Sequence, residues 1–307
     1  MIKQRFIIVC GKGGVGRTSV ACALATALAK RGNRTLIATS DSSSRRLSAL
    51  LGKKINTNIT VVGENLWAVN VDPVESVKEY ILMTLKLRSI QNLLTGTAFM
   101  QSFITSIPGI AEWAVIGKVT WHLIERKKGN YVYDKVILDA PATGHSFSLL
   151  KIPLYINKVI HSGPLHEVAK ERWTIISDGF TTGIAVVVVP EEMVITETFE
   201  FLKNINSSLS IPVITVFVNR VIPPLFDKEE VDYLKEIKNH DEGGEVDAAL
   251  FRIMRTEIQR RQIDRLKDKF KLVIIPDNMG SEFIPDGFGS MVEVVGDWLD
   301  NKNGNVY

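Results

Sequence analysis

The residues with the most specific chemistry lie near the N-terminus, in the run Gly11-Lys12-Gly13-Gly14-Val15-Gly16-Arg17-Thr18. An apolar run that predicts a strand precedes them, and an Ala- and Leu-rich segment that predicts a helix follows. In that context, glycines let successive backbone N–H groups converge on phosphate oxygens, and the helix N-terminus adds positive charge. Thr18 is placed to bind Mg²⁺ through its hydroxyl. We therefore expect nucleotide contacts from Gly11, Lys12, Gly13, Gly14, Val15, Gly16, Arg17, Thr18 and Ser19; a chance glycine-rich turn is the weaker alternative.

The loop contains two basic residues, which stand at different positions and have different expected roles. Lys12 comes early, and Arg17 occupies the position where a phosphate loop ordinarily has its lysine. Arginine keeps the charge, but its planar fork directs its donors differently, so the exchange is not conservative. We expect nucleotide binding to survive this exchange more easily than fast hydrolysis. Normal turnover with arginine remains the open alternative.

Carboxylates follow two other predicted strands. Asp139 ends the apolar run Val136–Asp139, where a carboxylate can hold Mg²⁺ through water. Asp41 follows Ser40 at the end of the second strand. Either carboxylate could instead cap the helix after it, and for Asp41 this alternative is the more serious one.

Apolar runs alternate with segments of helical period, which predicts an α/β fold with a mostly parallel sheet flanked by helices. The first helix is expected at Thr18–Arg31, ending at Gly32, and a helical segment at about 74–128 is expected before the Asp139 strand. A further helical segment is expected at Leu154–Ser177, and residues 1–307 are expected to form one domain. The predicted strands are Arg5–Cys10, Thr35–Thr39, Leu66–Val71, Lys135–Asp139, Ile184–Val189, Val213–Val218 and Leu272–Ile275.

Composition narrows the function classes. The net charge of +3 is spread over 307 residues, which does not indicate nucleic-acid binding. The start of the sequence does not resemble a signal peptide, and no apolar run is long enough to span a bilayer. Only Cys10 and Cys22 are present, so two unpaired core thiols and a cytoplasmic location are expected. Two cysteines are too few for a zinc, iron–sulfur or three-thiolate metalloid site.

Several strand ends together resemble the ArsA family, which includes arsenite-pump ATPases and the targeting ATPase for tail-anchored proteins. Asp139–His145 is similar to the family's D-T-A-P-T-G-H segment, and Phe217-Val218-Asn219-Arg220 to its V-V-N-Q adenine motif. Pro190–Thr198 resembles P-E-x-x-x-x-E-T, and Pro276–Gly280 falls where the family has a second adenine-side loop. Ser42–Arg46 departs from the family's P-A-H-N. The chain is identified as a member of this family, within the deviant Walker A (SIMIBI) class of P-loop NTPases.

The resemblance implies Mg²⁺-dependent ATP hydrolysis by a dimer. Lys12 would reach the partner's phosphates, and Asp41 would position the attacking water. Asn219 and Pro276 would contact adenine, and Gly144 and His145 would belong to a switch loop. ATP would drive binding and release of a protein client or a peripheral membrane partner. Homodimer and heterodimer with an ArsA-like paralogue both stay open.

Two alternative functions remain. The first is a weakly hydrolysing partner subunit of an ArsA-like heterodimer, in which Arg17 only holds nucleotide. The second is a positioning ATPase of the ParA or MinD kind, but the tail Val292–Tyr307 lacks the basic amphipathic helix of MinD-like proteins.

A client surface is expected between the third strand and the Asp139 strand. Apolar residues recur there at helical spacing, which suits a groove for a hydrophobic helix; ordinary packing against the sheet is the alternative. The stripe comprises Tyr80, Ile81, Leu82, Met83, Leu85, Leu87, Ile90, Leu93 and Leu94, extended by Phe99, Met100, Phe103 and Ile104.

Overall fold

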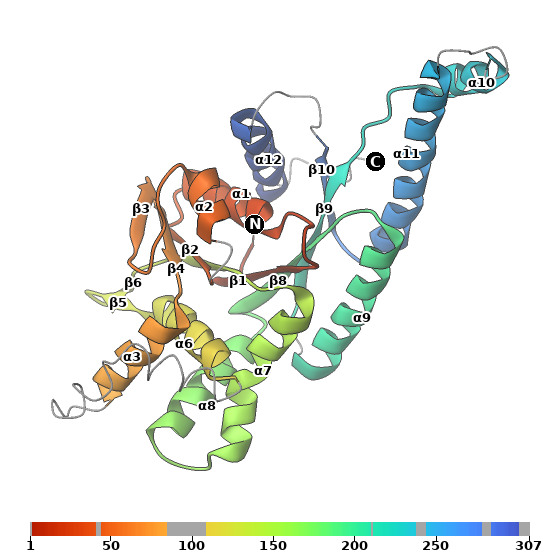
Figure 1. Ribbon diagram of the computed structural model, residues 1–307. Coiled ribbons are helices and arrows are strands. Elements are labelled where there is room, and N and C mark those ends of the chain that lie inside the picture. The colour runs from red at the N-terminus through yellow and green to blue at the C-terminus, as the bar shows by residue number, and fades with distance from the viewer. Residues whose placement is uncertain are drawn as a thin grey trace.

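The fold is described by a computed structural model covering residues 2–40, 44–84, 109–209, 211–237, 244–277 and 284–300. An eight-stranded sheet runs through its centre in the order β10-β9-β8-β1-β7-β2-β4-β3 (Figure 1). All neighbouring strands are parallel except β3 and β4. The strands are β1 (Phe6–Gly11), β2 (Thr35–Thr39), β3 (Thr60–Gly63), β4 (Leu66–Asn70), β7 (Lys135–Asp139), β8 (Thr182–Val188), β9 (Val213–Val221) and β10 (Leu272–Pro276). This confirms the expected fold class.

Helices cover both faces of the sheet. Figure 1 shows α1, α2 and α12 on one side of the sheet and α6, α7, α8 and α9 on the other. Helices α10 and α11 project beyond the edge of the sheet that β10 and β9 form. The helices are α1 (Arg17–Lys30), α2 (Ser44–Leu51), α3 (Pro73–Thr84), α6 (Ile110–Ile124), α7 (Thr143–Val159), α8 (Pro164–Ser177), α9 (Glu192–Leu209), α10 (Lys228–Ile237), α11 (Glu245–Lys267) and α12 (Ile284–Leu299).

The central strands are apolar runs because both of their faces are covered. Every residue of β1, β2, β7 and β8 is buried, as expected for parallel strands between two helical layers. Against them packs α1, whose small Ala and Cys side chains bring the helix close to the sheet. Cys10 and Cys22 are both buried, and neither forms a disulfide. The loop between β1 and α1 is therefore fixed at both of its ends by buried elements.

The C-terminal helix α12 packs on α1. The Arg31 guanidinium holds it there, donating from Nε and Nη2 to the Asp300 carboxylate at 2.8 and 2.6 Å. Trp298 packs edge-on against Phe217 of β9, with ring centroids 5.3 Å apart. These contacts bring the C-terminal part of the chain to the first helix.

One predicted helical segment needs correction, a second differs at its end, and one strand was not predicted. The expected helical segment at 154–177 is two helices, α7 and α8, separated at Gly163 (φ 94°). The segment expected at 74–128 ends in a hairpin, β5 (Arg126–Lys127) with β6 (Asn130–Tyr131), and its residues 85–108 lie outside the described ranges. Strand β3 was not predicted, because it is only half-buried and its four residues carry little periodic signal. Within the described ranges, no helix combines the length and apolarity needed to span a membrane.

Candidate nucleotide site

The glycine loop joins the end of β1 to the first turn of α1. Gly16 adopts φ 93°, a conformation that L side chains rarely take, and directly precedes α1. A Cβ there would lie 2.3 Å from Nδ2 of Asn219, and a Cβ at Gly11 would lie 2.4 Å from the Val187 carbonyl oxygen. The loop is therefore closely packed on β8 and β9, and it opens a helix as a phosphate-binding loop does.

Behind the loop, a hydroxyl and a carboxylate meet in a buried corner. The Thr18 hydroxyl donates to Oδ2 of Asp139 at 2.8 Å, and the Thr39 hydroxyl lies 3.4 Å from the same oxygen. Parallel pairing puts them there, because Asp139 stands opposite both Val9 of β1 and Thr39 of β2. Asp139 is 2% exposed, and its Oδ1 has no hydrogen-bond partner.

The Asp139 corner suits a hard cation. Burial raises the pKa of the Asp139 carboxyl, while the Thr18 hydrogen bond and the nearby Arg17 charge oppose this shift. A buried carboxylate with one unpartnered oxygen beside a hydroxyl provides oxygen ligands of the kind Mg²⁺ takes. The residues present thus fit the expected metal position. Elsewhere in the described ranges, no group of three His, Cys, Asp or Glu side chains could hold a metal ion.

The two basic residues of the loop already have partners. Lys12 Nζ lies 2.7 Å from Oε1 of Glu197 on α9, and both side chains are partly exposed. Arg17 Nη1 donates to the Gly11 carbonyl at 3.1 Å, and burial lowers the pKa of its guanidinium although Asp139 opposes this. Glu197 was noticed in the sequence only as part of a family segment. Its contact with Lys12 depends on β1 and β8 lying side by side.

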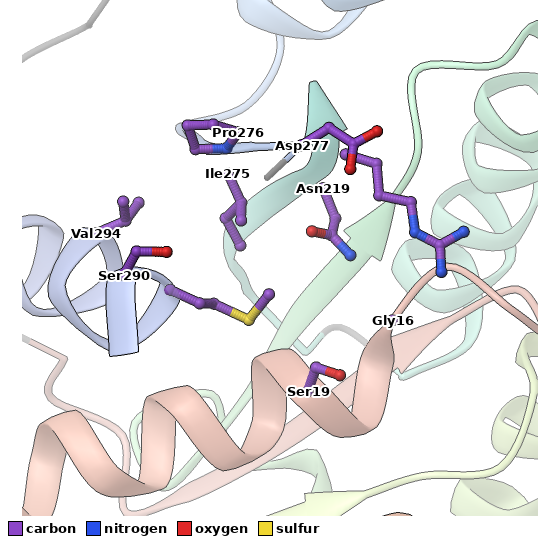
Figure 2. Close-up of a pocket in the computed structure, with 10 residues that line it drawn as sticks. Gly16, Ser19, Asn219, Ile275, Pro276, Asp277, Ser290 and Val294 are labelled. Atoms are coloured by element: carbon purple, nitrogen blue, oxygen red, sulfur yellow. The ribbon is translucent and has the colours of Figure 1, made fainter. Parts of the chain in front are cut away.

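A cavity of about 320 Å³ opens at the other side of the loop (Figure 2). Ser19 on α1, Asn219 on β9 and Pro276 on β10 face it, so the structure brings these three predicted residues to one cavity. Asn219 is fixed there by donating from Nδ2 to the Val15 carbonyl at 2.8 Å. The full lining is Gly16, Ser19, Asn219, Arg220, Ile275, Pro276, Asp277, Ser290, Met291 and Val294.

Sequence reasoning missed the α12 side of this cavity. Ser290, Met291 and Val294 lie more than 70 residues after Asn219 in sequence and form no motif with it. They line the cavity only because α12 packs on α1. Arg220 was noticed in the sequence only as the last residue of the segment similar to the adenine motif, and it too lines the cavity.

Three predicted site residues are not placed at the loop. Asp41 lies outside the described residues. Gly144 and His145, expected in a loop, lie in the first turn of α7, which begins at Thr143. The alternative of a capping role for Asp139 is not seen, because Ala142 precedes α7 and the Asp139 carboxylate accepts from Thr18.

Known proteins resemble this chain over half of its length or more. A family model described as anion-transporting ATPase (ArsA) matches residues 4–166. A Paramecium tetraurelia protein named ATPase ASNA1 homolog 1 is 34% identical over 156 residues, which are 50% of this chain and 45% of that protein. The ATPase BagA of Mycobacterium tuberculosis is 24% identical over 250 residues, 80% of this chain and 71% of BagA.

A third relative, from Prosthecochloris vibrioformis, is named putative arsenical pump-driving ATPase. It is 32% identical over 151 residues, which are 49% of this chain and 36% of the relative. The matched segments of the Paramecium and Prosthecochloris proteins thus cover less than half of those proteins. The family model, by contrast, covers more than half of this chain and includes both the glycine loop and Asp139. On these grounds the chain belongs to the ArsA family of ATPases.

Proposed function

We propose that this protein is a Mg²⁺-dependent ATPase that works as a dimeric switch, coupling ATP binding and hydrolysis to the binding and release of a protein client. The observation that carries the proposal is the buried pair of Thr18 and Asp139 directly behind the glycine loop, 2.8 Å apart. Phosphoryl transfer depends mainly on positioning and electrostatic stabilisation, and this pair with the loop N–H groups supplies both.

Each residue then has a stated role. The backbone N–H groups of the loop bind the phosphates, and the α1 N-terminus adds positive charge. Thr18 and Asp139 hold Mg²⁺, which neutralises charge on the β- and γ-phosphates. The cavity lined by Asn219 and Pro276 takes the adenine, since the Asn219 side chain offers both a donor and an acceptor.

The dimeric part of the proposal concerns Lys12. Its partly exposed ion pair with Glu197 is of the kind that contributes little to stability, so it can be exchanged for a phosphate at low cost. In the proposed closed dimer, Lys12 leaves Glu197 for the nucleotide of the partner subunit. The family resemblance supports this exchange, and it would couple ATP binding to dimer closure.

The client is proposed from sequence pattern. The apolar stripe beyond Thr84 lies outside the described residues, so it stays a prediction that a hydrophobic helix binds there. Nucleic acid is not proposed as a partner, and any membrane association would be peripheral. A cytoplasmic location is proposed, and two buried cysteines that form no disulfide support it.

A weakly hydrolysing partner subunit is the second candidate. The Arg17 contact with the Gly11 carbonyl favours it, because a guanidinium that donates within its own loop has fewer donors left for phosphate. Co-purification of a lysine-bearing ArsA-like chain would support that version.

Calorimetry with ATP, with and without Mg²⁺, tests the main proposal. We expect affinity well below millimolar, strengthened by Mg²⁺, and loss of the Mg²⁺ increment in Thr18→Ala. Thr26→Ala is the matched control, since its hydroxyl lies on the same helix and has no hydrogen-bond partner. Light scattering with a non-hydrolysable ATP analogue then measures dimer formation. A chain without nucleotide affinity, or a Mg²⁺ increment that Thr18→Ala leaves intact, would contradict the proposed site.

A further inference from the structure

Arg220 has an unusual backbone for its place in the fold. It is the penultimate residue of β9 and adopts φ 59°, in the left-handed region. Two other residues with a side chain have positive φ in the described ranges, Asn65 and Lys128, and both lie in hairpin turns. Such a conformation inside a strand is costly and persists where the surroundings hold it.

The surroundings hold Arg220 from both sides. Gln259 of α11 donates from Nε2 to the Arg220 carbonyl at 3.1 Å and accepts the Ile222 N–H at 2.8 Å. The neighbouring Val221 carbonyl accepts the Asp277 N–H at 2.8 Å. The pairing of β9 with β10 is irregular between Ile274 and Pro276, as is common beside binding sites.

This backbone changes where the Arg220 side chain goes. Side chains of successive strand residues point to opposite faces of the sheet. Asn219 and Arg220 would therefore normally not line the same cavity. Asn219 is buried against the glycine loop, yet both residues line the one cavity of about 320 Å³. The left-handed conformation of Arg220 is thus found where a second, consecutive residue of β9 lines the cavity.

The cavity offers an arginine on one side and an apolar wall on the other. The Arg220 side chain is exposed, and within the described ranges it makes no hydrogen bond or ion pair. The apolar lining comes from Ile275, Pro276, Met291 and Val294. A flat aromatic group fits between an apolar surface and a planar guanidinium, which stacks on π-systems.

We infer that Arg220 stacks its guanidinium on the nucleobase and closes the solvent side of the base pocket. The inference rests on the proposed function, since it requires a nucleotide in this site. It assigns to Arg220 a positioning role for the base, separate from phosphate binding by the loop.

The test compares ADP with inorganic tripolyphosphate, which has no base, by calorimetry. The variant is Arg220→Gly, because glycine adopts φ 59° without strain and the fold should be kept. We expect ADP affinity to fall about tenfold, tripolyphosphate affinity to be unchanged, and thermal stability without nucleotide to be at least equal. Arg220→Lys keeps the charge but loses the planar guanidinium, so its affinity for ADP should be as low as that of Arg220→Gly. Arg255→Ala, on the exposed face of α11, is the control and should bind both ligands normally.

The outcomes separate the two proposals. Unchanged ADP affinity in Arg220→Gly, with normal binding by the unaltered protein, overturns the stacking role alone. Equal losses for ADP and tripolyphosphate, restored by lysine, would make Arg220 a phosphate ligand and also overturn it. An unaltered protein that binds neither ligand overturns the proposed function, and the inference with it.

Discussion

The proposed phosphate end and the proposed base end of the site are built in different ways. The phosphate end is a contiguous loop with a buried carboxylate behind it, and Arg17 and Thr18 already donate hydrogen bonds within it. The base end is gathered from β9, β10 and α12, and one of its side chains, Arg220, is exposed. Phosphate recognition uses backbone N–H groups, which any sequence with the right glycines can present. Base recognition depends on side chains brought together by the fold, so it can vary from one relative to another.

The two ends meet at one point. Gly16 of the loop packs against the Asn219 amide, which itself donates to the Val15 carbonyl. A change at this contact should disturb both ends, whereas changes elsewhere should affect one. The predictions use that distinction.

Gly16→Val should have the largest effect. The added side chain would occupy the position of Asn219 Nδ2 and cannot adopt φ 93° without strain, so both ends are displaced. We expect ATP affinity to fall by more than about 100-fold, with reduced stability. Calorimetry and thermal unfolding measure the two effects. The control is Gly117→Val on α6, away from the loop, since a Cβ at Gly117 also meets no atom within 4 Å; equal losses in both variants would show that Gly16 does not join the two ends.

Lys12→Ala should separate catalysis from binding within the phosphate end. We expect hydrolysis to fall roughly 100-fold, as for loss of a charged group that acts on the transition state, while ADP affinity changes little. Steady-state phosphate release and ADP calorimetry are the measurements. Glu197→Gln is the companion variant, because it removes the resting partner of Lys12 and keeps the lysine. If Lys12→Ala weakens ADP binding as much as hydrolysis and ATP-driven dimer formation is unchanged, Lys12 acts only within its own loop.

Asp139→Asn should stabilise the metal-free protein by about 3 °C at neutral pH. Burial raises the pKa of Asp139 in the folded state, so the folded chain binds the proton more tightly than the unfolded chain. The stability contribution of Asp139 therefore falls as pH rises from about its ordinary value of 3.8 through the raised folded pKa. Thermal unfolding between pH 4 and pH 7 should show the variant's advantage growing with pH and shrinking when Mg²⁺–ADP is added.

Asp178→Asn is the control of opposite sign. The Thr181 hydroxyl lowers the pKa of Asp178, so this carboxylate contributes stability above its unfolded pKa and loses it as pH falls. Its replacement should lower stability at neutral pH slightly. A pH-independent gain in Asp139→Asn would mean that the buried charge is not the cause.

Arg17→Lys should have the smallest effect, a rise in hydrolysis of about two- to fivefold. Lysine is compact and can follow the γ-phosphate, whereas the Arg17 guanidinium donates to the Gly11 carbonyl. Arg45→Lys, on the exposed face of α2, is the control. A rate within the scatter of the assay would mean that arginine serves this loop as well as lysine.

The sheet, the glycine loop and the pair of Thr18 and Asp139 could be predicted from the sequence. These parts were predictable because they are local: a strand, a glycine-rich loop and a helix follow one another within Phe6–Lys30, and Asp139 ends a fully apolar strand. Parallel pairing then leaves little freedom, since strands of this kind align their carboxyl ends at one edge of the sheet.

The residues of the proposed base end and the partners of the basic residues follow from tertiary packing. No pattern in the sequence links Lys12 to Glu197, or places Asn219 and Met291 on the same cavity, because each arrangement depends on which strands are neighbours and on how α12 packs against α1. The positive φ of Arg220 is likewise invisible in the sequence, since it is imposed by Gln259 from a helix 39 residues away. Sequence periodicity reports which face of an element is buried; it carries no record of the neighbour that buries it.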